Sequence, residues 1–305
     1  NPLICDLEQI REEDLVVMEL SSFQLEIMES SPEIAVMLNI TPNHLDRHKT
    51  MGAYIAAKAR ILEFQSESDW AVLGWDDEDI RGLAGSVVGN LTGFGRNLEG
   101  VDGVSFDSDV FRLQWEGRET VICRTDESPL RGEHNLWNAA AAFTVCAIHG
   151  VEPEAMREAL MSFQGLPHRL EEVGRKRGLL WVNDSIATTP ERAAAALRSF
   201  TEPLAVLVGG KNKGLPWESF MLAANEHAEQ VILFGEAAEE ILASIEAECR
   251  CGVRKVDSLE EAVRKAAETA KKGRDVLLSP GCSSFDAYAD YEERGAHFRE
   301  LVGSL

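Results

Sequence analysis

Residues 178–197, "GLLWVNDSIATTPERAAAAL", contain one complete strand-to-helix unit and decide the fold class. The apolar run "LLWV" predicts a buried strand, and the polar triplet "NDS" ends it. "TPERAAAAL" then predicts a helix with a proline just inside its first turn, where the missing backbone donor costs nothing. A buried strand followed directly by a helix is typical of a parallel sheet.

The same alternation continues to the end of the chain. Strand patterns occur in "PLAVLVGG", "QVILFG" and "DVLLSPG". Helix patterns occupy residues 217–228, 237–248, 258–272 and 286–302. Strands that alternate with helices of 10–15 residues predict βαβ units, so the C-terminal half should form one parallel sheet covered by helices.

The N-terminal half also mixes strands and helices. "LVVMEL" (15–20), "IAVMLNI" (34–40) and "WAVLGW" (70–75) resemble strands, and "GAYIAAKARILEF" (52–64) resembles an amphipathic helix. Short alternating pieces between residues 86 and 124 predict a β-rich excursion, and two helices follow at 133–150 and 152–163. We therefore expect an α/β protein of two domains, residues 1–165 and 166–305.

Composition excludes several classes of function. The 305 residues carry a formal net charge of −22, which an anionic duplex or membrane surface would repel. No run of 18 apolar residues occurs, so we expect no membrane span. Six cysteines without motif spacing favour free thiols in a reducing cytoplasm. The chain opens without Met inside a stretch that reads as structured, so we expect it to be part of a longer protein.

Polar residues follow five of the expected strands. The clusters are Glu19, Ser21 and Ser22; Thr41, Asn43 and His44; Asn183, Asp184 and Ser185; residues 209–213; and residues 279–284. A single cluster of this kind is explained by a helix N-cap. Ligands of open α/β sheets bind beyond the carboxyl ends of the strands, so five clusters together predict an active site shared by two domains.

The first two clusters suggest a metal ion. Glu19 and His44 end successive strands, and a carboxylate with a neutral imidazole suits Mg²⁺ or Mn²⁺. A capping carboxylate and a satisfied histidine explain the same residues equally well. Lys58 lies within the following helix, where spacing alone favours a surface lysine.

The last two clusters suggest an anion. "GGKNKG" (209–214) is rich in glycine but lacks the GxxxxGK[ST] spacing of a P-loop, which occurs nowhere in these 305 residues. "SPGCSSFDAY" places Ser283, Ser284 and Asp286 at the expected start of the last helix, where backbone N–H groups attract a carboxylate. Lys213 could neutralise a second carboxylate, so a dicarboxylic amino acid would fit. Two ordinary helix caps remain an alternative.

Eight motifs resemble those of the Mur ligase family, in the same order along the chain. They are "ELSSFQLE", "LNITPNHLDRH", "YIAAKARI", "HNLWNAAAA", "LPHRLE", "NDSIATTPE", "LVGGKNKG" and "LSPGCSSFDAYADYEERGAHF". The first and last resemble most closely the members that join D-glutamate to UDP-N-acetylmuramoyl-L-alanine (UDP-MurNAc-L-Ala). The resemblance implies part of a central ATPase domain with a mixed or parallel sheet, followed by a Rossmann-like domain. The uridine-binding domain and the P-loop are expected upstream of residue 1, so this chain alone should be inactive.

The resemblance also implies a reaction. The substrate carboxylate takes the γ-phosphoryl group of ATP, and glutamate's amine then attacks the acyl phosphate, in cytoplasmic peptidoglycan precursor synthesis. Two Mg²⁺ ions would offset the crowded negative charge. We expect a monomer without nucleic-acid or membrane partners.

The resemblance assigns roles residue by residue. Metal-site residues would be Glu19, His44 and Lys58, the last if its amine is carbamylated. Ser21 and Ser22 would line the same pocket. Asn135, Asn138, Arg169 and Asp184 would contact the nucleotide, and Thr188, Lys213, Ser284, Phe285 and Tyr291 would form the D-glutamate pocket.

One position departs from the family pattern, because Ile186 stands where these ligases commonly have lysine. An isoleucine supplies no charge, so another cation could serve, or the preference could change to L-glutamate. Two other functions stay open. One is a different ligase of the family, such as a folylpolyglutamate synthase, and the other is a non-catalytic module that binds a nucleotide or an amino acid.

Overall fold

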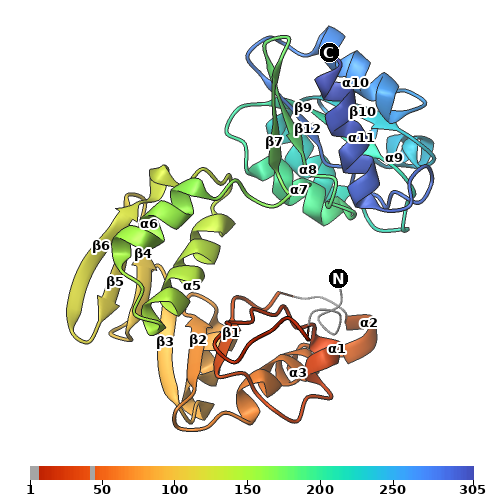
Figure 1. The fold of residues 1–305 in the computed structure, drawn as a ribbon. Coiled ribbons are helices and arrows are strands. Elements are labelled where there is room, and N and C mark those ends of the chain that lie inside the picture. Colours follow the sequence, from red (N-terminus) through yellow and green to blue (C-terminus); the bar gives the residue numbers. More distant parts are fainter. Residues whose placement is uncertain (1–6, 42–44) are drawn as a thin grey trace. The chain divides into compact units, whose positions relative to one another are not determined.

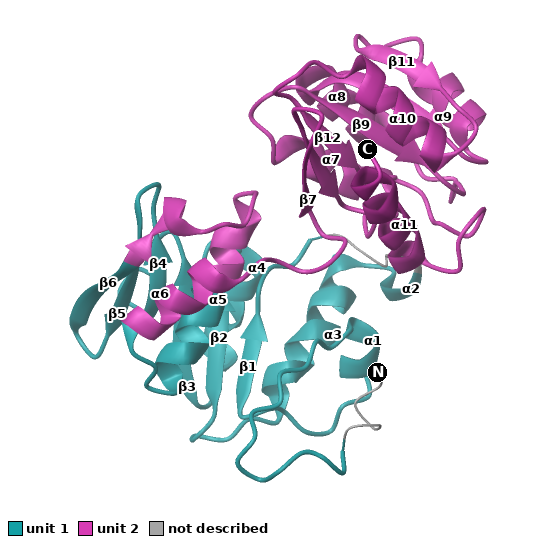
Figure 2. Cartoon of the chain, turned by 45° about the horizontal axis from the view of Figure 1, so that its top comes forward, with its two compact units in different colours: residues 1–122, 140–153 teal, residues 123–139, 154–305 magenta. Residues whose placement is uncertain are grey.

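The computed structural model describes residues 7–41 and 45–305. The chain forms two compact units (Figure 2). Unit 1 comprises residues 1–122 and 140–153, and unit 2 comprises residues 123–139 and 154–305. The expected boundary at 165/166 differs from this division and stays a prediction. No helix in the described ranges is long and apolar enough to cross a membrane.

Unit 1 is built on a six-stranded sheet whose strands follow the order of the sequence (Figure 1). The strands are β1 (Ile34–Met37), β2 (Trp70–Gly74), β3 (Asn90–Gly95), β4 (Gly103–Phe106), β5 (Val110–Trp115) and β6 (Arg118–Arg124). β1 to β4 pair in parallel, and β4 and β5 pair antiparallel. The expected β-rich excursion is therefore confirmed as an extension of the sheet.

The helices of the first half of the chain are α1 (Ser22–Leu25), α2 (Leu45–His48), α3 (Met51–Glu63), α4 (Glu78–Arg81), α5 (His134–Ile148) and α6 (Pro153–Ser162), with 3-10 turns at Gly82–Ser86 and Thr125–Glu127. These α-helices belong to unit 1, except that α5 and α6 cross the division between the units. Tyr54 and Leu62 of α3 share a buried apolar cluster with Leu73 of β2. Phe143 of α5 meets Phe111 edge-on, with ring centroids 5.3 Å apart. Apolar contact thus fixes α3 and α5 on the sheet.

The expected strand at residues 15–20 is wrong. These residues form no strand, and the side chain of Val17 is 95% exposed. Leu15 and Met18 are exposed as well. A short apolar run becomes a strand only when a neighbouring backbone pairs with it, and none of the described residues does so here.

Unit 2 carries the alternating fold expected from the sequence. Its sheet has the order β11-β10-β9-β12-β8-β7. The strands are β7 (Glu171–Lys176), β8 (Leu179–Asn183), β9 (Leu204–Gly209), β10 (Ala228–Phe234), β11 (Gly252–Lys255) and β12 (Asp275–Leu278). All neighbours pair in parallel except β7 and β8. The chain leaves β8 for β9 and returns later to place β12 between them, which makes a topological switch point.

Helices cover both faces of this second sheet (Figure 1). The helices are α7 (Pro190–Arg198), α8 (Glu218–His227), α9 (Ala238–Ile245), α10 (Leu259–Thr269) and α11 (Tyr291–Gly303). Val206 and Val208 of β9 pack in the cluster that includes α7, α8 and α9. Ala205 and Leu207 of the same strand pack in the cluster of α10 and α11. The alternation along β9 therefore fills two buried layers, as expected for a central parallel strand.

The last helix begins later than the sequence predicted. α11 starts at Tyr291, and its N-cap is Asp290, whose side chain accepts from the backbone N–H of Glu293. Ser283 precedes it in a β-bridge with Lys211, and Ser284 and Asp286 precede it in a bend and a turn. The prediction that they cap a helix is wrong, because Asp290 supplies the capping carboxylate instead.

Candidate functional site

The three central strands of unit 2 end side by side in polar loops. β12 pairs with both β8 and β9, so the loops at 183–189, 209–214 and 279–288 leave neighbouring strand ends. The sequence predicted polar clusters at these three ends, and the sheet brings them together. Carboxyl ends at a switch point are where α/β sheets bind ligands.

Backbone pairing joins two of these loops. Lys211 N–H donates to the Ser283 carbonyl at 2.8 Å, and Ser283 N–H donates back to the Lys211 carbonyl at 3.1 Å. The approach is so close that a Cβ atom on Gly210 would lie 2.2 Å from the Ser283 carbonyl oxygen. Gly210 also has a φ of 130°, which side-chain-bearing residues rarely adopt. Glycine is therefore required where the loops after β9 and β12 meet.

Lys213 and Thr188 reach each other from different loops. The Lys213 ammonium donates to the Thr188 hydroxyl oxygen at 3.2 Å. Partial desolvation lowers the pKa of Lys213, and the positive charges of Arg192 and Arg294 lower it further. No described carboxylate forms an ion pair with Lys213. This lysine therefore offers a positive charge to an anion in a chain that is otherwise strongly acidic.

Ser284 and Phe285 lie side by side in sequence but differ in exposure. Ser284 is buried, with 2% of its surface exposed, whereas Phe285 is 68% exposed. The Ser284 carbonyl accepts from the backbone N–H groups of Ala287 and Tyr288 and closes a turn. Phe285 thus presents an aromatic ring to solvent from a turn that is anchored at its base.

Asp184 is buried directly after β8. Its carboxylate accepts from the Ser279 hydroxyl at 2.9 Å and from the Leu170 backbone N–H at 3.2 Å. Burial raises the pKa of Asp184 to about 7, despite these hydrogen bonds and the positive charges of Arg169 and Arg192. A carboxyl group with such a pKa changes its charge near neutral pH, which is common at functional sites.

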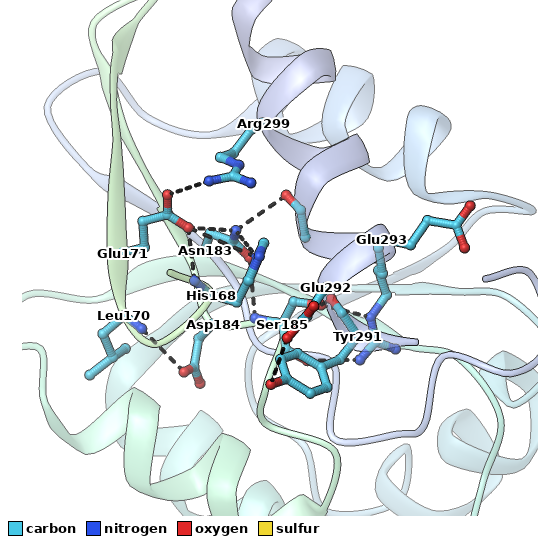
Figure 3. A network of polar contacts seen from close by, with 12 residues as sticks. His168, Leu170, Glu171, Asn183, Asp184, Ser185, Tyr291, Glu292, Glu293 and Arg299 are labelled. Atoms are coloured by element: carbon cyan, nitrogen blue, oxygen red, sulfur yellow. Dashed lines mark hydrogen bonds and ion pairs between the residues drawn. The ribbon is translucent and has the colours of Figure 1, made fainter. Parts of the chain in front are cut away.

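A second polar network lies beside this carboxylate (Figure 3). The Asn183 amide donates to Glu171 Oε2 at 2.9 Å and lies 3.1 Å from His168 Nδ1. Glu171 also pairs with Arg299 of α11 at 3.1 Å. The ring of Tyr291 meets that of His168 edge-on at 6.2 Å between centroids. The network holds the segment before β7 against α11.

The four residues expected at the nucleotide differ in their surroundings. Arg169 is exposed, next to buried His168. Asn135 donates to the Arg131 carbonyl at 2.7 Å, and Asn138 donates to the Asn135 side-chain oxygen at 3.1 Å. Asn138 is exposed in the first half of α5. Asp184, described above, is the buried member of the four.

In unit 1, the residues of "ELSS" adopt three different environments. Glu19 is exposed and has no bonding partner among the described residues. Ser21 caps α1, where its hydroxyl accepts from the Gln24 backbone N–H and the Gln24 side chain accepts from Ser21 N–H. Ser22 is 4% exposed, and its hydroxyl lies 3.0 Å from Nε2 of His48. The capping box shows why a Ser-Ser pair starts this short helix.

His48 was missed at the sequence level. Its Nδ1 lies 3.2 Å from Glu26 Oε1, and its ring stacks on Phe23 with 5.7 Å between centroids. The side chain of His48 is therefore bonded at both nitrogens and covered by an aromatic ring. The "H-L-D-R-H" spacing contained it, but no local signal separates this buried histidine from a metal ligand.

Only some of the residues predicted to bind a metal lie among the described residues, so the metal site stays a prediction. His44 and Asn43 lie outside the described residues, and Thr41 is exposed. Lys58 lies in α3 with its amine 5.3 Å from the centroid of the Tyr54 ring. Among described residues, no three His, Cys, Asp or Glu side chains gather as a metal site would require. The free carboxylate of Glu19 suits Mg²⁺ as one oxygen ligand.

Sequence comparison identifies two domain families along this chain. The Mur ligase middle domain matches residues 3–146, and the Mur ligase glutamate ligase domain matches residues 168–282. These two ranges include the candidate residues of unit 1 and the first two loops of the unit 2 site.

Curated relatives resemble the whole chain. It is 41% identical to the UDP-N-acetylmuramoylalanine–D-glutamate ligase of Symbiobacterium thermophilum, over all of this chain and 68% of the relative. It is also 41% identical to the ligase of the same name from Desulfitobacterium hafniense, over 97% of this chain and 65% of the relative. The chain thus spans about two thirds of the length of these relatives.

Solved structures share the fold. The UDP-N-acetylmuramate–alanine ligase MurC of Thermotoga maritima matches with a TM-score of 0.65 at 18% identity, over 93% of this chain and 62% of that one. At this identity the match supports the α/β architecture of two mostly parallel six-stranded sheets.

Proposed function

This chain belongs to the Mur ligase family, and we propose that it forms the catalytic and amino-acid-binding parts of a ligase that joins D-glutamate to UDP-MurNAc-L-Ala with ATP. The product would be a peptidoglycan precursor, with ADP and phosphate released. The contact between Lys213 and Thr188, beside the paired loops after β9 and β12, carries this proposal. It joins a hydroxyl to an ammonium group that has no carboxylate partner among the described residues, at the strand ends where a dicarboxylate is proposed to bind.

The D-glutamate pocket is proposed to consist of Thr188, Lys213, Ser284, Phe285 and Tyr291. Lys213 would face the side-chain carboxylate, because its ammonium has no carboxylate partner among the described residues. Ser284 and the neighbouring backbone would donate to the same group. The exposed ring of Phe285 would cover the bound amino acid and exclude water from it.

The nucleotide is proposed to contact Asn135, Asn138, Arg169 and Asp184. Arg169 is exposed and can reach phosphate oxygens, for which its guanidinium is well shaped. Asp184 can accept a ribose hydroxyl, and a nearby phosphate-binding arginine would favour its charged form. Asn135 and Asn138 already hydrogen-bond each other, which aligns both amides along one side of α5.

Magnesium is proposed to bind through Glu19, His44 and, if its amine is carbamylated, Lys58. Bound Mg²⁺ would neutralise phosphate charge during transfer. Glu19 is exposed and unpaired among described residues, so its carboxylate is free to serve. Ser21 and Ser22 would position this carboxylate through the α1 cap and the buried Ser22–His48 contact, respectively.

The proposed reaction has two steps. A carboxylate oxygen of UDP-MurNAc-L-Ala attacks the γ-phosphorus of ATP, and the bond to ADP breaks. The lone pair of the D-glutamate amine then attacks the acyl carbon, the C–O bond to phosphate breaks, and the amine loses a proton. Holding the amine close to the acyl carbon is the task of the glutamate pocket.

Phosphate release tests the proposal. The chain would be joined to the expected upstream segment, with the uridine-binding domain and the P-loop, and supplied with ATP, UDP-MurNAc-L-Ala and either D- or L-glutamate. D-glutamate-dependent release of phosphate is expected, and the 305-residue chain alone should be inactive. Ile186 makes L-glutamate the alternative substrate. A binding module would instead hold nucleotide or amino acid without turnover, even with that upstream segment present.

A further inference from the structure

The guanidinium group of Arg294 is fully buried where the loops after β8, β9 and β12 meet. Its Nε donates to the Ser185 hydroxyl at 3.0 Å, and Nη2 donates to the Ser185 carbonyl at 2.9 Å. Both Nη atoms donate to the Cys282 carbonyl at 3.2 Å. Nη1 also reaches the Gly209 carbonyl at 3.4 Å. One side chain of α11 thus bonds one residue at each of three strand ends.

These partners are unusual for a buried arginine. They are backbone carbonyls and one hydroxyl, and no described carboxylate bonds the guanidinium. Burial lowers the pKa of Arg294 to about 10, while Asp286 favours its charged form through space. Arg294 therefore remains charged at neutral pH. Burying a charge without an ion-pair partner is unfavourable, so a packing role alone explains this residue poorly.

The planar shape of the guanidinium allows it to hydrogen-bond several loops at once. Its planar fork presents five N–H donors in fixed directions, whereas a lysine amine presents three on a flexible stem. The space around it is full, because a Cβ atom on Gly210 would lie 2.9 Å from Nη1 of Arg294. The guanidinium of Arg294 and the absence of a side chain at Gly210 therefore set how closely the three loops approach one another.

Each of these loops carries a residue of the proposed amino-acid pocket. Thr188 follows Ser185 in the first loop, Lys213 follows Gly209 in the second, and Ser284 follows Cys282 in the third. We infer that Arg294 is a positioning residue of the D-glutamate site, whose fork holds Thr188, Lys213 and Ser284 in register for the substrate carboxylate. This inference rests on the proposed function, and it adds a residue that touches neither the substrate nor the nucleotide.

Kinetics of two Arg294 variants separate the effect of the planar guanidinium from the effect of its positive charge. Arg294→Lys keeps the positive charge and loses the fork, and Arg294→Met loses both. Assayed in the complete ligase, both variants should raise the KM for D-glutamate about 10- to 100-fold, as expected for displaced binding groups. The KM for ATP should change less than about twofold. A wild-type KM for D-glutamate in Arg294→Lys, or equal changes in both KM values, would overturn the inference.

Val302→Ala is the matched control. Val302 is buried on the same helix and packs in the cluster of α10 and α11, outside the three loops. This variant should leave both KM values within about twofold of wild type. A rise in the D-glutamate KM as large as that of Arg294→Lys would mean that any disturbance of α11 has this effect, and would contradict a specific role for Arg294.

Hydrogen exchange provides a test that needs no substrate. In Arg294→Lys, backbone amides in residues 183–189, 209–213 and 279–285 should exchange faster together, while Val302→Ala should leave them unchanged. Unchanged exchange in all three loops would refute the positioning role even if Arg294→Met fails to fold. If wild-type ligase shows no D-glutamate-dependent turnover, the proposed function fails, whereas the exchange result still decides whether Arg294 couples the loops.

Discussion

Gly295 and His168 occupy a space that holds only one side chain, since a Cβ atom on Gly295 would lie 2.1 Å from Nδ1 of His168. The imidazole fills this space and meets the Asn183 amide, which also donates to the Gly295 carbonyl at 3.2 Å. The segment that carries Arg169 is thereby held against α11. The dipeptide Arg294-Gly295 thus contacts both the strand-end loops and the segment before β7.

Gly295→Ala should therefore displace His168 and destabilise unit 2. A cost of about 1–3 kcal/mol in the free energy of unfolding is expected from such overpacking. Gly303→Ala, on the same helix, has no heavy atom within 4 Å of the added Cβ and should be neutral or slightly stabilising. Urea denaturation of both variants checks this, and equal stabilities for the two would contradict the steric account.

Lys213→Ala should raise the KM for D-glutamate far more than that for ATP. The change removes a cation that bonds Thr188 and has no carboxylate partner among the described residues. An increase of about tenfold or more is expected from loss of one charge-assisted contact. Lys211→Ala removes an equal charge from the same loop but keeps the backbone pairing with Ser283. Similar effects of the two changes would point to overall charge rather than to a pocket.

Lys58→Ala in the complete ligase should remove most activity, and added bicarbonate should not restore it. If the amine is carbamylated, it acts as a carboxylate-like metal ligand, which alanine cannot replace. Lys58→Arg keeps a cation that cannot be carbamylated and should be inactive too. Turnover by either variant at the wild-type rate would refute a metal-binding role.

Asp184 should make the stability of unit 2 depend on pH. Burial raises its pKa from 3.8 to about 7 in the folded protein. Between these two pH values the folded state holds a proton that the unfolded state has lost. The contribution of Asp184 to the free energy of unfolding is therefore fully present below pH 3.8 and is lost as the pH rises through about 7. Asp184→Asn should gain stability relative to wild type between pH 5 and pH 8, by an amount on the order of a few kcal/mol. Urea denaturation of both proteins at pH 5 and pH 8 checks this. A free-energy difference between variant and wild type that is the same at both pH values would contradict the raised pKa.

Local patterns predicted much of this fold. β9 and β12 are short apolar runs followed by helices, so periodicity alone identified them. β7 and β11 were missed because they are edge strands with charged residues, "EEVGRK" and "GVRK", which look like loops. The start of α11 was predicted too early because Asp286 and Asp290 are both favourable N-cap residues, and only the observed turn between them shows which one caps the helix.

The candidate site was less predictable than the fold. The polar strand ends could be found because the switch-point rule indicates where to look. The contacts of Arg294 join residues up to 109 positions apart in sequence, so no local pattern reveals them. For the exposed segment containing Val17, by contrast, a local pattern predicted a strand that does not form, because the segment lacks a pairing partner in the described structure.

The proposed function depends most directly on which amino acid supports turnover. Phosphate release by the complete ligase, with ATP and UDP-MurNAc-L-Ala present, should require D-glutamate and should remain at background with L-glutamate. Release with L-glutamate alone would keep the ligase chemistry but contradict the proposed substrate. No release with either amino acid, in a folded protein that still binds nucleotide, would contradict the ligase function itself.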